Sequence, residues 1–369
     1  MKMTKEATPR QQGFKMPAEW AHHAGTFFAW PHLEETFPGH LREAQNAIAQ
    51  SIKALTKFGN QEQPELAKVL IRNQVDRHSA LERLRFFNVA EAHFELIEIP
   101  TNDVWIRDYG PIILTHPDGH RAVVSFRFDG WGGKDGHYYG EHAGRDDKVA
   151  SRLAKHLELP CFESSLVLEG GAIEVDGEGT LLTTENCLLE RSSDAPSREV
   201  FESTLSEFLG IDKVVWLPGA SFDGDDTEGH IDNITRFVGP ARVVTAVAAS
   251  KDDPWHDKLE TQRQVLSKAR DVQGRQLEVI PIPLPSPHHL YASMDGDLDL
   301  HRYPASPLNF IIGNQVILVP VYGDPNDRLT LDTLASVFPS RNVIPIDSSI
   351  YILGQGSLHC SSQQEPSGK

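Results

Sequence analysis

The chain has 369 residues, of which 39% are hydrophobic and 24% are charged, so wholesale disorder is excluded and a sizeable core is expected. Its formal net charge of -17 argues against nucleic acid or anionic membranes as partners and favours cationic small molecules. No stretch approaches the ~18 apolar residues of a membrane-spanning helix, and residues 1–15 are too polar for a signal peptide, which predicts a cytoplasmic protein.

Amphipathic helices are predicted at six places, where apolar residues recur at spacings of three and four. Their ranges are 41–58, 78–87, 147–157, 197–209, 254–272 and 327–338, and Asp327 is a candidate N-cap of the last one. Hairpin turns are predicted where short turn dipeptides lie between apolar or β-branched runs. These dipeptides are Asp118-Gly119, Asp176-Gly177 and Glu178-Gly179.

A weak repeat runs along the chain, because an extended apolar run meets a polar or glycine-rich segment five times. The pairs are 96–100 with 105–108, 165–168 with 169–171, 214–218 with 229–232, 310–315 leading into 316–320, and 343–346 with 354–360. Hairpins that alternate with single helices predict an α/β repeat closed into a ring, which brings the polar segments to one axis and removes sheet edges. We expect one domain over 1–369, with loose ends at 1–13 and 365–369.

If the polar segments form one site, they supply a thiol, an imidazole and several carboxylates. The residues are Asp108, Glu169, His230, Asp232 and Cys360. A lone cysteine is more often a small core residue than a nucleophile. Cys360, however, lies in a polar, glycine-bearing segment, whereas Cys187 lies beside two leucines. We therefore interpret Cys187 and Cys161 as structural or incidental. With no C-x-x-C pair and an odd count, a disulfide framework is not expected.

Three of these segments have alternative interpretations. Gly229 to Asp232 alternates like a strand, which would point His230 and Asp232 to one face, or it could be half of a metal site. A metal would need further ligands at matched spacing, and none is found, so we expect no metal. Asp108 could pair with Arg107 structurally, or lie beside the Trp105 ring in a site for a planar cation. Glu169-Gly170-Gly171 could be a bare turn, or let a carboxylate approach a ligand.

The ordered series of motifs resembles the agmatine deiminases, a family joined with the bacterial peptidylarginine deiminases in the pentein superfamily. The resemblance covers residues 14 to 366. It rests on Met16–Trp20, Trp30-Pro31, Trp105–Asp108, Gly130–Gly133, Leu168–Gly171, Thr180–Glu185, Gly229–Asn233 and His359–Gln364. The chain departs from the pattern at Glu174, where a histidine is common. The resemblance implies an α/β-propeller of five pseudo-symmetric ββαβ-type units.

The resemblance also implies roles for individual residues. Cys360 would be the nucleophile, His230 the general acid and base, Asp108 and Asp232 the carboxylates that grip a guanidinium, and Glu169 the acid that orients His230. Trp105, Asp226 and Asn309 would contact the substrate. The implied reaction converts agmatine to N-carbamoylputrescine and ammonia through a covalent amidino-cysteine, as a step of putrescine biosynthesis, without a cofactor. A homo-oligomer is a further expectation.

Other functions are compatible with parts of this pattern. A deiminase of free or peptidyl arginine, or an amidinotransferase, would use the same catalytic residues. A non-catalytic pentein that binds a protein partner would need neither Cys360 nor His230. A thiol protease or amidase would need an oxyanion hole, which the cluster of acids would disfavour.

Overall fold

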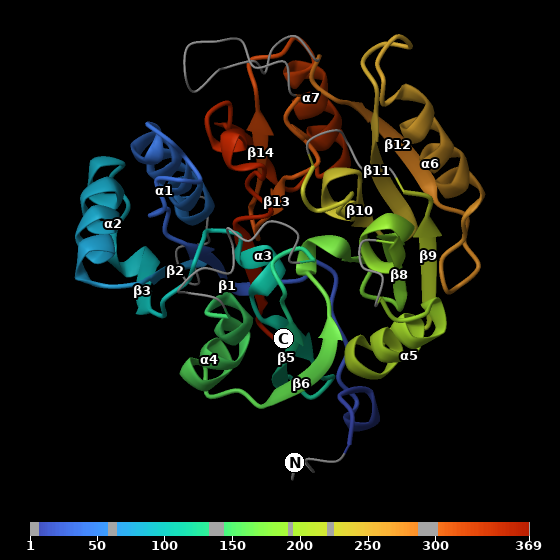
Figure 1. Cartoon of the computed structure of the whole chain (residues 1–369), viewed down its shortest axis with the longest axis horizontal. Helices are drawn as coiled ribbons and strands as arrows, with labels where there is room; N and C mark the ends of the chain where they lie inside the picture. The colour runs from blue at the N-terminus through green and yellow to red at the C-terminus, as the bar shows by residue number, and fades with distance from the viewer. Residues whose placement is uncertain are drawn as a thin grey trace.

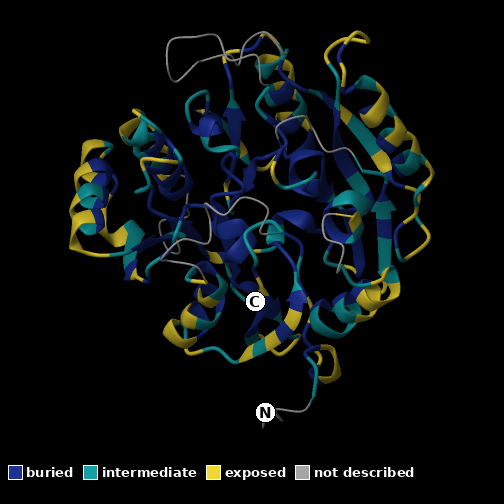
Figure 2. Ribbon diagram, in the orientation of Figure 1, coloured by how far each residue is buried: buried dark blue, intermediate teal, exposed yellow. Residues whose placement is uncertain are grey.

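The computed structural model describes residues 7–57, 65–132, 144–190, 195–219, 225–286 and 302–368. Five small sheets are arranged around a common centre, and helices lie at the periphery (Figure 1). Buried residues gather toward that centre, whereas exposed residues lie mostly on the outer helices (Figure 2). The predicted propeller of five α/β units is confirmed.

Four units share one pattern: an antiparallel hairpin, a helix, and a third strand parallel to the second. They are β4 (Ile112–Thr115), β5 (Arg121–Arg127), α4 (Val149–His156) and β6 (Cys161–Val167); β7 (Glu174–Val175), β8 (Thr180–Thr184), α5 (Arg198–Leu209) and β9 (Lys213–Leu217); β10 (Thr235–Gly239), β11 (Arg242–Val247), α6 (His256–Lys268) and β12 (Glu278–Pro283); and β13 (Ile311–Ile312), β14 (Val316–Val321), α7 (Asp327–Val337) and β15 (Asn342–Asp347).

The remaining unit joins the two ends of the described chain. β16 (Ser362–Pro366) pairs antiparallel with β1 (His23–Ala29), with Phe28 opposite Ser362. β2 (Leu66–Ile71) and β3 (Phe94–Glu98) complete this sheet in parallel, connected by α1 (Leu41–Lys57) and α2 (Gln74–Phe86). The ring is therefore closed by strands from opposite ends of the sequence.

The helix α1 shows how sequence periodicity builds the core. Ile48, Ile52 and Leu55 recur at the spacing of one helical face and are buried. This face packs on β14 and β15 of the neighbouring unit as well as on β2 of its own. The burial of these side chains thus ties two units together across the closure. No helix among the described residues is both long and apolar enough to cross a membrane.

Several local predictions need correction. The fourth predicted run is the hairpin β13–β14, and the third strand of the preceding unit is β12, whose apolar pattern is interrupted by Pro281 and Pro283. The N-cap of α7 is Asn326, while the Asp327 carboxylate accepts from the backbone of Tyr322 and Asp324.

The predicted loose ends also need correction. Residues 365 and 366 belong to β16, and the buried Glu365 carboxylate pairs with Lys68 at 2.6 Å and with Arg121 at 2.8 Å. Near the other end, Arg10–Gln12 forms a short 3-10 helix that contacts α5. The first six residues and the last lie outside the described part of the chain.

Candidate active site

Cys360 lies between a short 3-10 helix (Tyr351–Gly354) and β16. Asn309 holds it from two sides: its Nδ2 lies 3.0 Å from the Sγ atom, and its Oδ1 accepts the Cys360 backbone N–H at 3.1 Å. The Asp232 Oδ2 atom lies 3.6 Å from Sγ. Burial, together with the charges of Asp232 and Asp108, holds the pKa of the Cys360 thiol well above its usual value. At rest the sulfur is therefore protonated.

His230 is fully buried between two carboxylates. Its Nδ1 lies 3.6 Å from Asp108 Oδ1, and its Nε2 lies 3.9 Å from Glu169 Oε2. Burial alone would lower the pKa of His230, but the charge of Asp108 and the contacts with Cys187 and Glu169 raise it well above the ordinary value. The ring is therefore an imidazolium, which is a proton donor.

The His230 segment is not a strand, contrary to the prediction. Residues Ile231–Asn233 form a 3-10 turn. The turn is stabilised by Asp225, whose Oδ2 accepts from the Gly229 N–H at 2.9 Å, and Gly229 has a φ of 91°. The two side chains still lie in neighbouring parts of the site, because His230 contacts Asp108 and Asp232 contacts Cys360.

The Asp108 carboxylate is fixed by two hydrogen-bond donors and by the tight packing of Gly171 against it. Its Oδ1 accepts the Gly171 N–H at 3.0 Å, and its Oδ2 accepts the Trp131 Nε1–H at 3.0 Å. A Cβ at Gly171 would lie 2.6 Å from His230 Nδ1 and 2.8 Å from Asp108 Oδ1, so only glycine fits. Burial raises the pKa of Asp108 to about 6, and the Trp131 hydrogen bond opposes that rise.

A cavity of about 750 Å³ leads to Cys360. Trp105 forms part of its wall and is held by Phe37 and Tyr351, at ring-centroid distances of 6.3 Å and 5.8 Å. Gly356 lies directly against this ring, since a Cβ there would come within 2.4 Å of it. The wall is therefore flat, as a planar ligand requires.

The charged side chains in the described lining of this cavity are all carboxylates. Asp103, Asp108, Glu35 and Asp226 line it, the first two buried and the last two exposed. Among the described lining residues there is no lysine, arginine or histidine. Burial raises the pKa of Asp103 to about 6. The cavity is thus suited to a ligand that carries positive charge over much of its length.

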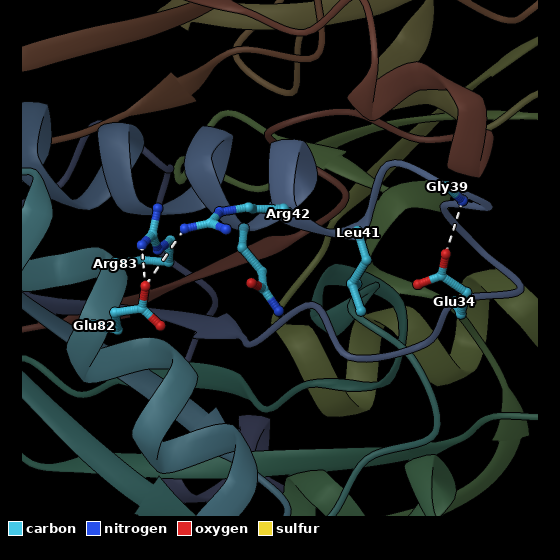
Figure 3. A pocket seen from close by; sticks show the side chains of 7 residues that line it. Glu34, Gly39, Leu41, Arg42, Glu82 and Arg83 are labelled. Carbon is cyan, nitrogen blue, oxygen red and sulfur yellow. Dashed lines mark hydrogen bonds and ion pairs between the residues drawn. The ribbon is translucent and has the colours of Figure 1, made fainter.

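A second hollow, between the start of α1 and α2, is different in character (Figure 3). Its charged groups satisfy one another: Glu82 pairs with Arg42 at 3.5 Å and with Arg83, and Glu34 accepts the Gly39 N–H at 2.8 Å. It holds none of the predicted site residues, so the cavity at Cys360 is the candidate active site.

The structure brings all eight predicted site residues together, but in two layers. Trp105, Asp108, Asp226 and Cys360 line the cavity. Glu169, His230, Asp232 and Asn309 are fully buried beside Asp108 and Cys360. Asn309 therefore contacts the thiol rather than the cavity.

Sequence reasoning assigned no role to several neighbours of these residues. Trp131 and Glu19 lie in motifs that carried the resemblance, and His359 directly precedes Cys360, but nothing local indicated that they touch the site. Cys187, interpreted as structural or incidental, has its thiol beside His230 and Glu169. Its Sγ atom, one ring nitrogen of His230 and one carboxylate oxygen of Glu169 all lie within 4.8 Å of one another. It also packs in the core beside Leu188.

Five α/β units around a central site, with a cysteine, a histidine and carboxylates on the connecting segments, define a guanidine-modifying enzyme of the pentein superfamily. Residues 15–366 match the model of the Porphyromonas-type peptidyl-arginine deiminase family, and the chain belongs to that family. It is 36% identical to the agmatine deiminase of Stutzerimonas stutzeri, over 98% of each chain.

Two solved structures extend this similarity to the fold. The agmatine deiminase of Enterococcus faecalis is 30% identical with a TM-score of 0.86, covering 99% of each chain. A cysteine-to-serine variant of the C. jejuni agmatine deiminase, with substrate bound, is 26% identical with a TM-score of 0.81, covering 96% of each chain.

Proposed function

We propose that this protein is an agmatine deiminase, which hydrolyses agmatine to N-carbamoylputrescine and ammonia. The observation that carries the choice of substrate is the cavity lining: carboxylates at its buried and exposed parts, and no cationic side chain among the described residues. Agmatine is positively charged at both ends. Free arginine carries a carboxylate at one end, and its binding would require a cationic side chain in the cavity.

The proposed reaction starts with the guanidinium held by Asp108 and Asp232 through paired hydrogen bonds. Because His230 is already protonated, the Cys360 thiol loses its proton to solvent as the cation binds. The thiolate sulfur then bonds to the guanidinium carbon, and His230 gives a proton to the nitrogen that leaves as ammonia. An amidino group then stays bound to the sulfur. Water adds to its carbon with His230 taking a proton, and the C–S bond breaks to release the ureido product and the thiol.

The substrate itself would help to form the thiolate. In the free site, burial and the nearby carboxylates hold the pKa of Cys360 high, while His230 is protonated. A guanidinium placed between Asp108 and Asp232 offsets their charges, which lowers the cost of a negative sulfur beside them. Cys360 would thus become a stronger nucleophile when a cation occupies the cavity.

The dependence of kcat/KM on pH tests the role of Asp108. Only the ionised carboxylate binds a guanidinium, so kcat/KM is expected to fall as the pH drops through about 6, the pKa of Asp108. Trp131→Phe removes a donor to the carboxylate. Because a hydrogen bond to a charged group is worth about 1.5 kcal/mol, the acidic limb should move up by about one pH unit.

The matched control is Trp216→Phe, since the Trp216 Nε1–H also donates to a carboxylate, that of Glu202 on the surface of α5. Its acidic limb should coincide with that of the wild type. An unchanged limb in Trp131→Phe would contradict the assignment of that limb to Asp108.

Asp226 is proposed to receive the ammonium at the far end of agmatine. An exposed ion pair contributes about 1 kcal/mol, which corresponds to about fivefold in affinity. Asp226→Ala should therefore raise KM for agmatine about fivefold and leave KM for shorter guanidines unchanged. Initial rates over a series of alkylguanidines measure this. Glu34→Ala, an exposed acid outside the cavity, is the control. The same effect in Glu35→Ala but not in Asp226→Ala would move the ammonium partner to Glu35.

Ammonia release from agmatine, free arginine and an arginine peptide, each with a Cys360→Ala control, tests the function as a whole. Turnover of agmatine alone supports the proposal, and activity on arginine or its peptide would replace the substrate but keep the mechanism. Silence on all three would favour amidino transfer or a binding role. A cytoplasmic location, a place in putrescine formation and a homo-oligomer stay predictions.

A further inference from the structure

A buried chain of alternating charges lies behind the nucleophile. The His359 side chain is 2% exposed. Its Nδ1 lies 2.8 Å from Asp232 Oδ2, and its Nε2 lies 2.9 Å from Glu19 Oε2. The Glu19 carboxylate also accepts from Arg236 at 2.5 Å and from the Ile312 N–H at 3.0 Å. The residue next to Cys360 is therefore anchored to the interior of the ring.

Both carboxylates that face His359 are ionised. Burial would raise the pKa of Asp232, but the hydrogen bond and charge of His359 lower it. Burial opposes ionisation of Glu19 too, but Arg236 and His359 hold the pKa of Glu19 well below its ordinary value. A neutral imidazole has one N–H, so it could donate to only one of them. Both short contacts are satisfied when the His359 ring is protonated on each nitrogen.

The two oxygens of Asp232 have different surroundings. Oδ2 receives His359 Nδ1, lies 3.3 Å from Asn309 Nδ2, and is the atom nearest the Cys360 sulfur. Oδ1 is buried and has no hydrogen-bond partner among the described residues. A fully buried, unpartnered carboxylate oxygen is costly unless a ligand completes it. This oxygen is therefore the one left for the substrate.

We propose that His359 is a positioning residue for the deimination reaction. As an imidazolium it fixes Asp232 Oδ2, so that Oδ1 is presented to the guanidinium, and it offsets the carboxylate charge beside the Cys360 sulfur. This inference rests on the proposed function for its first part. The second part concerns the free enzyme and can be tested without a guanidine.

Other charges around His359 do not take its place. Arg107 donates through Nε to the His359 carbonyl at 3.2 Å, and its Nη1 is held by Gln364 at 2.6 Å. Arg236 reaches the ring only through Glu19, and its Nε pairs with Glu174 at 2.8 Å. The charge of His230 also acts on Asp232, but without a hydrogen bond. Among the described hydrogen-bond partners of the Asp232 carboxylate, His359 is thus the cationic one.

Two substitutions separate position from charge. His359→Asn keeps a side-chain donor near Nδ1, and so toward Asp232, without the positive charge, whereas His359→Ala removes both. We expect kcat/KM for agmatine to fall about 10- to 100-fold in His359→Ala, because a hydrogen bond to a charged group is worth about 1.5–3 kcal/mol. In His359→Asn, KM for agmatine should lie much closer to the wild-type value than it does in His359→Ala.

The second readout is alkylation of Cys360 by iodoacetamide, followed at that peptide by mass spectrometry between pH 6 and pH 9. Where the alkylation rate rises with pH, it is proportional to the fraction of Cys360 present as thiolate. Without the positive charge of His359 the thiolate is less stable, so both variants should react about 3- to 10-fold more slowly at pH 7. This measurement needs no turnover.

His23→Asn is the matched control. His23 is another buried ring, with Nδ1 3.0 Å from Glu65 Oε1 and Nε2 2.7 Å from the Glu19 carbonyl oxygen. Neither of these two partners is hydrogen-bonded to Asp232 or Cys360 among the described residues. It should lower the melting temperature but leave the alkylation profile unchanged. Circular dichroism establishes that each variant is folded, and if His359→Ala is not, His359→Asn carries the test.

Wild-type alkylation rates in both His359 variants, or an equal slowing in His23→Asn, would overturn the inference and leave His359 a structural residue. If wild-type protein releases no ammonia from agmatine but the alkylation rates still differ, the proposed function fails while the electrostatic role of His359 stands. The two failures are therefore distinguishable.

Discussion

Serine in place of Cys360 is expected to lower kcat for agmatine about 10⁴-fold or more, the scale of losing a covalent nucleophile. An alcohol is far less acidic than a thiol, and this site holds even the pKa of the thiol high because of burial and the charges of Asp232 and Asp108. A single-turnover assay with mass spectrometry should show an amidino adduct on the wild-type Cys360 peptide and none in the variant.

Cys161→Ser is the control, since Cys161 is exposed at the start of β6, away from the site. It should stay within about twofold of the wild type, as surface substitutions usually do. Turnover by Cys360→Ser at near the wild-type rate would refute covalent catalysis by this residue, whatever the substrate.

The second large effect is expected at His230. His230→Asn should lower kcat about 10²- to 10⁴-fold, because general acid and base help is worth that much and the ring is the protonated group placed between Asp108 and Glu169. Binding of agmatine should be affected less, since the carboxylates stay. Stopped-flow measurement of ammonia release and equilibrium binding of agmatine to the Cys360→Ala background separate the two.

His156→Asn serves as its control: this histidine also pairs with a glutamate, Glu95, at 3.0 Å, but on the surface. It should leave kcat unchanged. If His230→Asn keeps more than a tenth of the wild-type kcat, proton transfer must be assigned to another group, and Glu169 would be the first to test.

Much of the fold could be predicted because its signals are local. Apolar spacing in 41–58 and 197–209 gave helices that end within one residue of α1 and α5. The dipeptide Asp118-Gly119 lies at the β4–β5 turn as predicted. The strand β12 lacks such a signal, because its two prolines and half-exposed side chains obscure the alternation.

The candidate site also has residues that could be predicted from local sequence and others that could not. Cys360 and Asp108 are recognisable because a thiol or carboxylate in a polar, glycine-rich or aromatic segment is unusual. The charges behind them are not recognisable, because Glu19, Arg236 and His359 meet only after folding and charged residues are normally expected at the surface. The strand assigned to Gly229–Asp232 fails because side-chain capping by Asp225 favours a turn over an alternating pattern that is only four residues long.

The pairing of β16 with β1 has a consequence for how activity is lost. The nucleophile lies immediately before the strand that seals the ring, so its geometry depends on a contact between distant parts of the polypeptide. The strand is buried along its whole length, and its Glu365 carboxylate pairs with Lys68 and Arg121, so the active geometry lasts only as long as this contact is intact. Enzyme activity during denaturation therefore reports on the β1–β16 contact, and it should be lost in every state in which β16 has separated from β1, even where the other four sheets are still folded.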